Sequence, residues 1–418
     1  MSAIKKVMVN KKLPYERNPI PEDNKPLKFE TETIPSIITF GISIGLGVFS
    51  FPGCDRNLAI AEPIPYIFVT TFLIRFNLSS VKKRNQLIIP VFIPHEGCPY
   101  RCAFCNQSKI TGVNQQSDEI IVRQTIQSYL DVLDSEGLPE KREVAFYGGS
   151  FTGLPEERQK RLLQAVEPSI YSGEVHSIRV STHSLLVNSH NISLLKENNV
   201  KTVELGIQST NDRVLQAVGR PCDFDTVKSA VDSIRKDGLR LGLQLMPGLP
   251  EDDENIFMKS VQDVIGLMPD FVRIYPTLVI KNTELYEMYK LGKYLPWKLN
   301  RMVRLVKDAL IAFQKENIPV IRVGLHADPS MLENFVDGPY HPAFRYLVDR
   351  LIAREKMFNL INQLQEIPEA ITFKVPSRQV SLYLGHKKDN IQAIQNMYGI
   401  NNILIQQIGD QEDLQLVA

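Results

Sequence analysis

A regular alternation of short apolar runs and amphipathic stretches, beginning at Leu87, constrains the fold of this chain more than any other feature. The runs are apolar at nearly every position, as strands buried on both faces of a parallel sheet are. They read LIIPVFI (87–93), EVAFYG (143–148), SIRVST (177–182), TVELGI (202–207), LRLGLQLM (239–246) and FVRIYP (271–276). Between them lie helical stretches, several with Asp or Asn near the start as a cap. The pattern predicts an α/β fold whose parallel sheet is either curled into an open barrel or doubly wound, with ligands at the carboxyl ends of its strands.

Changes in composition divide the part of the chain from residue 85 onward into three segments. The six runs and their helices occupy 85–295. A helical extension follows at 296–370, where Leu299–Lys315 is the clearest amphipathic helix. The last segment, 371–418, reads strand, helix, strand and predicts a small α/β tail.

Residues 1–84 are a different kind of sequence. They are polar and rich in proline at first, then uncharged from Ile34 to Cys54, with a second apolar run from Ile64 to Ile74. The uncharged run is long enough to span a bilayer but contains two prolines and four glycines. We interpret 1–84 as a poorly specified N-terminal extension; the alternative is contact with a membrane through residues 34–76.

Three of the five cysteines, Cys98, Cys102 and Cys105, lie within eight residues, directly after the first predicted strand. So low and odd a count does not suit a disulfide framework and indicates a reducing compartment, the cytoplasm. Three thiolates on one loop suit an iron-sulfur cluster that keeps one iron open for a further ligand. The alternative is a zinc knuckle with His95 as fourth ligand, although the chain has no second cysteine pair of zinc-site spacing.

The spacing Cys98-x3-Cys102-x2-Cys105, with the aromatic Phe104 before the last cysteine, resembles the radical S-adenosylmethionine (SAM) superfamily. The resemblance extends over roughly residues 85–345 and implies an open partial (β/α)6 TIM-type barrel. It also implies that the three cysteines hold a 4Fe-4S cluster and that SAM binds the fourth iron. An electron donor would reduce the cluster, and SAM would then be cleaved to methionine and a 5′-deoxyadenosyl radical.

The same resemblance implies further cofactor-binding residues at the strand ends. FYGGS at 146–150 resembles the superfamily's Gly-Gly-Glu motif, in which the backbone of Gly148 and Gly149 approaches the methionine part of SAM, and Ser150 replaces the usual Glu or Thr. Polar residues at the next strand ends would hold the ribose and methionine parts, and the turn MPGLP would shape the adenine pocket. The predicted cofactor-binding residues are therefore Phe104, Gly148, Gly149, Ser181, Gln208 and Gln244. Weaker candidates for the substrate entrance are Arg273, Tyr275, Lys281, Arg322 and His326.

Within the superfamily, VELGIQS, LGLQLMPGLPED and RIYPTLVIKNTELYEMYKLGKYLPW resemble the radical-SAM half of the elongator catalytic subunit, which modifies wobble uridine in tRNA. The gap from Cys98 to Cys102 is shorter than in that family, and no acetyltransferase segment follows within the 418 residues. We therefore expect the chain to be most similar to bacterial elongator-like radical SAM proteins without the acetyltransferase.

The tail offers a second clue to the substrate. YLGHKKDNIQAIQNMYGINNILI (383–405) resembles the KH module, whose GxxG loop clamps RNA phosphates at a helix start. Gly385 matches the first glycine, Lys388 replaces the second, and Lys387 lies beside it. The formal charge of the chain is only +1, and the tail has four Lys or Arg against four Asp or Glu, so RNA would have to bind at a local site. An ordinary surface helix explains the same pattern.

These observations lead to one expected function and two alternatives. The expected function is a radical SAM enzyme with a 4Fe-4S cluster that modifies RNA, plausibly tRNA. The first alternative is a radical SAM oxidase or related catalyst acting on a small metabolite. The second is a non-catalytic iron-sulfur protein that binds RNA or assists assembly.

Overall fold

The computed structural model describes residues 86–93, 97–105, 118–133, 139–325 and 329–417. The predicted extension 1–84 and its membrane contact through 34–76 lie outside the described residues, as do His95 and His326. In the described ranges, no helix is both long and apolar enough to cross a membrane.

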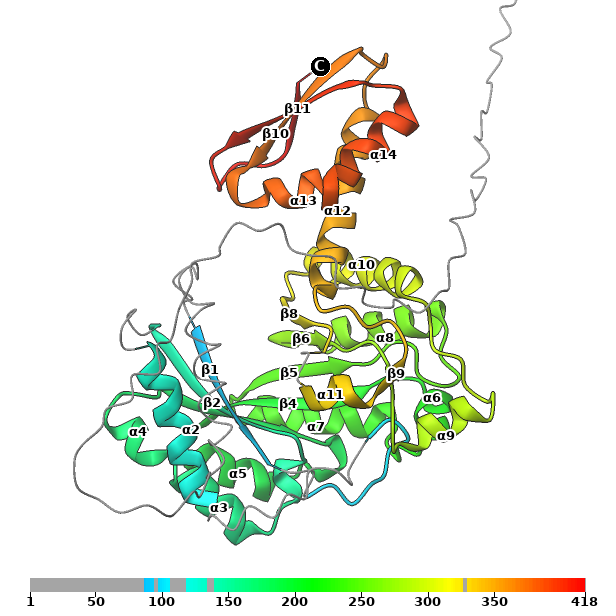
Figure 1. Ribbon diagram of the computed structural model, residues 1–418. Coiled ribbons are helices and arrows are strands. Elements are labelled where there is room, and N and C mark those ends of the chain that lie inside the picture. Colours follow the sequence, from blue (N-terminus) through cyan, green and yellow to red (C-terminus); the bar gives the residue numbers. More distant parts are fainter. Residues whose placement is uncertain (1–85, 94–96, 106–117, 134–138, 326–328, 418) are drawn as a thin grey trace, which may run out of the picture. The chain divides into compact units, whose positions relative to one another are not determined.

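The core of the molecule is one parallel sheet of seven strands in the order β1-β2-β3-β4-β5-β6-β8 (Figure 1). Neighbours in space follow the order of the chain, as in a sheet that curls progressively into an open barrel. This confirms the predicted open-barrel fold class and its six strands. The strands are β1 (Gln86–Phe92), β2 (Lys141–Tyr147), β3 (Ser177–Thr182), β4 (Val200–Gln208), β5 (Arg240–Leu245), β6 (Phe271–Ile274) and β8 (Val320–Val323).

The seventh strand, β8, corrects the sequence analysis, which gave the sheet six strands and placed residues 296–370 in a helical extension. Val320–Val323 pairs in parallel with β6. The strand has only four residues, one of them Arg322, so its apolar pattern is too short to distinguish from the flanking loop. Its pairing with β6 places part of the predicted extension inside the sheet.

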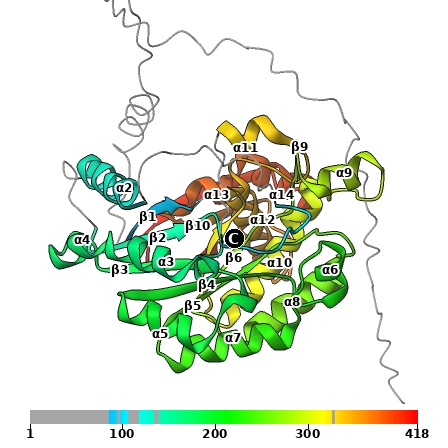
Figure 2. The same ribbon diagram turned by 90° about the horizontal axis from the view of Figure 1, so that it is seen from below.

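Helices connect the strands and cover one side of the sheet; Figure 2 shows α5, α7 and α8 along that side. The predicted caps are present: Asn211, Asp223 and Asp253 each accept a hydrogen bond from the backbone of the first helical turn. Such a cap stabilises its helix by about 1 kcal/mol. The helices are α2 (Asp118–Leu133), α3 (Glu156–Gln164), α4 (Glu167–Tyr171), α5 (Ser189–Glu197), α6 (Asp212–Ala217), α7 (Phe224–Lys236), α8 (Glu254–Gly266) and α10 (Leu299–Lys315).

The two faces of the sheet differ in chemistry because alternate residues of a strand point to opposite sides. The face toward the helices is apolar: Ile89, Val144 and Ile178 are register partners, all fully buried in the main hydrophobic core. The opposite face, which we call the inner face, is polar. Its register partners include Ser181 with Glu204, and Gln244 with Arg273.

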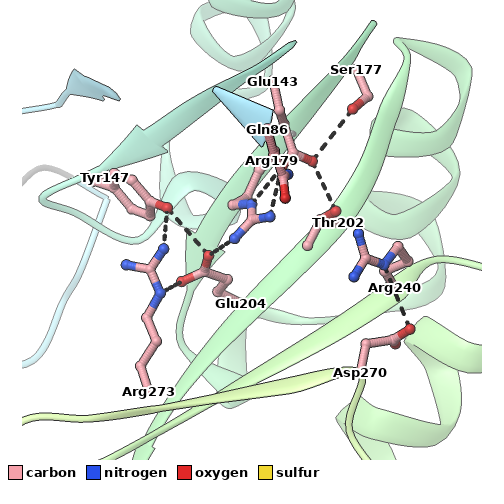
Figure 3. Close-up of polar contacts among 10 residues, drawn as sticks. All are labelled: Gln86, Glu143, Tyr147, Ser177, Arg179, Thr202, Glu204, Arg240, Asp270 and Arg273. Atoms are coloured by element: carbon pink, nitrogen blue, oxygen red, sulfur yellow. Dashed lines mark hydrogen bonds and ion pairs between the residues drawn. The ribbon is translucent and has the colours of Figure 1, made fainter. Parts of the chain in front are cut away.

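A buried ion-pair network crosses the inner face, as Figure 3 shows. The Arg179 guanidinium, 2% exposed, donates to Glu143 Oε2 (2.6 Å from Nη2) and to Glu204 Oε1 (2.7 Å from Nη1). Arg273 lies 3.0 Å from the other oxygen of Glu204 and donates to the Tyr147 hydroxyl (2.5 Å). The network is therefore a set of two carboxylates and two guanidiniums whose formal charges cancel.

The remaining elements form two smaller groups. Strands β7 (Val279–Ile280) and β9 (Phe335–Asp337) pair with each other, near α9 (Glu284–Lys290) and α11 (Pro329–Asn334). The long helix α12 (Phe344–Ile361) packs on α10 and leads to the tail, whose three-stranded sheet has the order β11-β10-β12. The tail consists of β10 (Ala370–Pro376), α13 (Val380–Leu384), α14 (Asp389–Tyr398), β11 (Asn402–Ile408) and β12 (Gln415–Val417).

We expect Arg179→Met to lower the free energy of unfolding by about 3–5 kcal/mol, because it would leave Glu143 and Glu204 buried without their shared counter-charge. Urea unfolding followed by circular dichroism measures this. The control is Arg213→Met, which breaks an exposed pair with Glu251 and should cost at most about 1 kcal/mol. Equal effects of the two substitutions would contradict the structural role given to the network.

Candidate functional site

The three clustered cysteines lie on a loop at the carboxyl end of β1, where the sequence places them. Cys102 is 7% exposed, while Cys98 and Cys105 are half-buried, and none of the three is in a disulfide. Ala103, between them, donates its N–H to the Val218 carbonyl after α6 (2.9 Å) and accepts from the N–H of Leu285 in α9 (2.7 Å). Two distant segments thus fix the middle of the cysteine loop by main-chain hydrogen bonds.

A glycine pair brings the start of this loop against the turn that follows β2. Gly97 precedes Cys98 with a positive φ of 79°, and a Cβ there would overlap the Ser150 carbonyl oxygen. A Cβ on Gly153 would in turn overlap the carbonyl oxygen of Gly97. The backbone of the cysteine loop is in direct contact with the backbone of the turn after β2, so only glycine fits at positions 97 and 153.

The predicted glycines Gly148 and Gly149 follow directly at the end of β2. Gly148 is exposed, its φ is 94°, and a Cβ would lie 2.7 Å from the Ile93 carbonyl oxygen at the end of β1. The backbone of this pair is therefore bare and open to a ligand. Ser150 is buried, and its side chain makes no capping hydrogen bond to the turn that begins there.

The structure joins two predicted cofactor residues that are 36 positions apart in sequence. Gln244 Nε2 on β5 donates to Gln208 Oε1 on β4 (3.1 Å). Gln208 ends its strand at an irregularity of register with φ at 70°, a left-handed conformation that is rare for a residue other than glycine. Such strained backbone is concentrated at ligand sites, which supports a binding role for this amide pair. Ser181 lies on the same inner face, half-buried, as the register partner of Glu204.

Arg220 is a site residue that the sequence analysis missed. Its guanidinium is 6% exposed, lies 3.5 Å from Cys102 Sγ through Nη1 and donates to the Gly206 carbonyl through Nη2. Its Nε has no hydrogen-bond partner in the described part of the chain. The sequence signal that could have identified it is the motif GRPC shortly after α6, because an arginine between glycine and proline lies outside any helix.

His183, directly after β3, is a second residue with unmet hydrogen-bonding capacity. The ring is 2% exposed and lies 4.9 Å from the Tyr100 ring in the cysteine loop. Burial, and next the nearby Arg220 charge, lower the pKa of His183 to about 3, so the ring is neutral. Nδ1 accepts from the Leu185 N–H (3.2 Å), which puts the proton on Nε2, an atom with no partner in the described ranges.

The other predicted residues divide between the inner face and an apolar cluster. Phe104 packs with Ala103, Val214 and Leu249 in a cluster beneath the cysteine loop. Arg273, Tyr275 and Arg322 lie on the inner face, whereas Lys281 follows β7 and donates its backbone N–H to Asn334 (2.8 Å). In the turn MPGLP, the Gly248 N–H donates to Asp252 (2.8 Å), and burial raises the pKa of that carboxyl to about 7.

The assembled residues fit a thiolate-bound cluster with an organic cofactor beside it. The described residues contain no group of three or more His, Cys, Asp or Glu side chains arranged around a single metal ion. An iron-sulfur cube is larger than one ion and takes thiolates at separate corners, so spaced thiols suit it. Two buried nitrogen atoms, on Arg220 and His183, have no partner among the described residues and are available for hydrogen bonds to a cluster or to an anionic cofactor group.

We expect Gly153→Ala to destabilise the chain by about 1–3 kcal/mol and to weaken iron binding by about tenfold or more, because its Cβ would push the Gly97 carbonyl and hence the Cys98 segment away. Iron retained after anaerobic reconstitution, together with a thermal melt, measures both effects. The control is Gly266→Ala, whose Cβ would meet nothing within 4 Å. Full iron retention by Gly153→Ala would show that this contact does not position the cysteine loop.

Comparisons with known proteins point to one superfamily. Residues 92–264 match the Radical SAM superfamily, and residues 269–354 match the Radical_SAM C-terminal domain. An uncharacterized protein of Methanocaldococcus jannaschii is 27% identical over 247 residues, covering 56% of this chain and 75% of its own length. The tRNA uridine(34) acetyltransferase of Methanocaldococcus infernus is 27% identical over 201 residues, covering 43% of this chain but only 38% of its own length.

A solved structure, that of the archaeal Elp3 from Methanocaldococcus infernus with an N-terminal deletion, superposes with a TM-score of 0.53 at 22% identity. The match covers 66% of this chain and 64% of that one, and it shows a shared fold. The two family matches are four residues apart and together cover the strands from β2 to β8, the cysteine loop and α10. The chain belongs to the radical SAM superfamily, with elongator-like relatives, and carries a Radical_SAM C-terminal domain.

Proposed function

We propose that this protein is a radical SAM enzyme that holds a 4Fe-4S cluster on Cys98, Cys102 and Cys105 and modifies tRNA. The observation that carries the proposal is the placing of three cysteines, none of them in a disulfide, on one loop at the carboxyl end of β1, with the Arg220 guanidinium 3.5 Å from Cys102 Sγ. When bound, the cluster and SAM supply the radical chemistry, and a reducing partner supplies the electron.

The protein's own residues bind and orient the cofactors. Arg220 offers a buried positive charge beside Cys102, which suits the carboxylate of SAM. The bare backbone of Gly148 and Gly149 offers C=O groups that can accept hydrogen bonds from its amino group. The Gln208–Gln244 amide pair offers donors and acceptors for the ribose hydroxyls.

The apolar cluster beneath the cysteine loop keeps water away from this region. It includes Phe104, Val218, Leu249 and Tyr294. A site closed to water protects a reactive organic radical from side reactions.

The tail supports RNA as the substrate. The loop Gly385–Lys388 joins α13 to α14, and Lys387 and Lys388 both have positive φ, 52° and 63°, so the second adopts the backbone form of the glycine it replaces. Gly385 has φ 75° and ψ 174°, a backbone conformation that is essentially limited to glycine, so the first glycine is required. Successive left-handed residues before a helix turn backbone N–H groups toward one point, as anion-binding loops do, and the two lysines add charge there.

We expect Cys102→Ala to reduce 5′-deoxyadenosine formation by at least about 100-fold, because one cluster ligand is lost. The assay is anaerobic reconstitution with iron and sulfide, followed by dithionite and SAM. Cys222→Ala is the matched control, since Cys222 is a free thiol outside the loop and should leave the yield within about twofold. An iron-loaded wild-type protein that never cleaves SAM would exclude the catalytic proposal and favour a binding role.

We expect Lys387→Glu with Lys388→Glu to weaken binding of bulk tRNA by about tenfold or more at low salt and to reduce the slope of log affinity against log salt by about 2, one per phosphate contact. Filter binding over a salt series measures both. Lys201→Glu with Lys236→Glu, two exposed lysines elsewhere, makes the same charge change as a control. If both double variants lose equal affinity, the loop is not the RNA site; if wild type cleaves SAM but never binds tRNA, the substrate is a small molecule.

A further inference from the structure

The inner face of the sheet carries a row of residues that begins at the proposed SAM site and continues beyond it. Gly206, Gln244, Arg273 and Arg322 are consecutive register partners on β4, β5, β6 and β8. Gln244 belongs to the amide pair at the proposed SAM site. The row therefore runs from that site to the edge strand β8 and ends in two adjacent arginines.

The first of these arginines already has a carboxylate partner. Arg273 pairs with Glu204 (3.0 Å) and donates to the hydroxyls of Tyr147 (2.5 Å) and Tyr275 (3.1 Å). Glu204 is shared with Arg179, whose other partner is Glu143. Two positive and two negative charges balance, so this network has no negative charge to spare for a third guanidinium.

Arg322 is that third guanidinium. It is half-buried, and in the described part of the chain its contact is from Nε to the Gly324 carbonyl (3.3 Å), with no carboxylate within ion-pair distance. Like charges directly opposite each other destabilise a sheet, and burial of an unpaired charge adds to the cost. An arginine in this position, next to Arg273, is best explained by an anion that binds there.

The surroundings specify the geometry of that anion. The bond to Gly324 shows that the Arg322 side chain extends toward the carboxyl end of β8, the end of the sheet where the SAM site lies. Directly after the adjacent strand β6, the Tyr275 hydroxyl oxygen accepts from Arg273, and within the described ranges no acceptor takes the hydroxyl proton, which can therefore be donated to a ligand. A guanidinium fork beside a hydroxyl donor matches the oxygen atoms of a phosphate.

We propose that Arg322 and Tyr275 form a phosphate-binding subsite that holds the substrate nucleotide at the mouth of the barrel, beside the SAM site. The inference rests on the proposed function and deepens it: it identifies the substrate as one that carries a phosphate next to the reacting group. A nucleotide of RNA has such a phosphate. The subsite gives the edge strand β8 a role in substrate positioning.

The test compares two ligands that differ only in the phosphate, uridine 5′-monophosphate and uridine. Dissociation constants are measured on the reconstituted full-length protein with SAM present, by ligand-observed NMR at constant ionic strength. We expect wild type to bind the monophosphate about tenfold more tightly than uridine, the value of one charge-assisted hydrogen-bonded contact. Arg322→Gln should bind both equally, and Arg322→Lys should keep part of the preference.

The controls separate this subsite from general electrostatics and from folding. Arg240→Gln removes an arginine from the same strand face, at the start of β5 and paired with Asp270, and should keep the full preference. Uridine binding by each variant shows that it is folded. A preference that survives Arg322→Gln, or that disappears equally in Arg240→Gln, overturns the subsite.

Two further outcomes distinguish the ligand source and the proposed function. If inorganic phosphate binds as tightly as the monophosphate and depends equally on Arg322, the subsite stands, but its ligand is a small phosphorylated molecule and not a nucleotide. If wild type fails to cleave SAM while the Arg322-dependent preference is present, the proposed catalytic function fails and the subsite stands. Failure of the preference with intact SAM cleavage overturns the subsite alone.

Discussion

The ion pairs of Arg179 with Glu143 and Glu204 are the interaction on which the inner face depends. A half-open barrel cannot fill its inside with apolar side chains and still admit a cofactor and a substrate, so polar groups must be buried there. Charges taken from water are tolerated only when they are paired and hydrogen-bonded. The two carboxylates receive donors from four strands, β2, β3, β4 and β6, together with Gln86 of β1. The network thereby links five strands of the curved sheet through the same polar groups that line its inner face.

The cysteine loop depends on a different constraint, the close approach of main chains. Gly97, Gly148 and Gly153 each lie where a Cβ would meet a carbonyl oxygen. These contacts fix the loop, while Arg220 and His183 beside it keep buried nitrogen atoms that have no partner in the part of the chain that the structure describes. The site therefore combines a rigid backbone with unmet hydrogen-bonding capacity, the combination that a bound cofactor group would complete.

The sequence predicts the features that local pattern controls. The apolar runs give the strands, Asn211, Asp223 and Asp253 give helix starts, and the cysteine spacing gives the loop that would hold a cluster. It does not predict β8, where four residues carry too little pattern. It also does not predict Arg220 or His183, because their importance lies in contacts with segments far away in sequence. The family resemblance predicts the two glutamines as cofactor residues, but their mutual hydrogen bond follows only from the register of β4 and β5.

The arginines of the inner face differ in whether a carboxylate of the protein neutralises them. Arg179 and Arg273 neutralise carboxylates, so their role in the folded chain is explained by the protein alone. Arg322 follows them in the same polar layer, yet the described chain supplies it with no carboxylate, and its neighbour in register is another arginine. Two carboxylates neutralise Arg179 and Arg273, and none of the described carboxylates pairs with Arg322. One positive charge therefore stays available at the barrel mouth. Because opposite charges attract strongly in a partly dry site, a residual positive charge in this position would favour an anion over a neutral ligand, which is the physical basis of the proposed subsite.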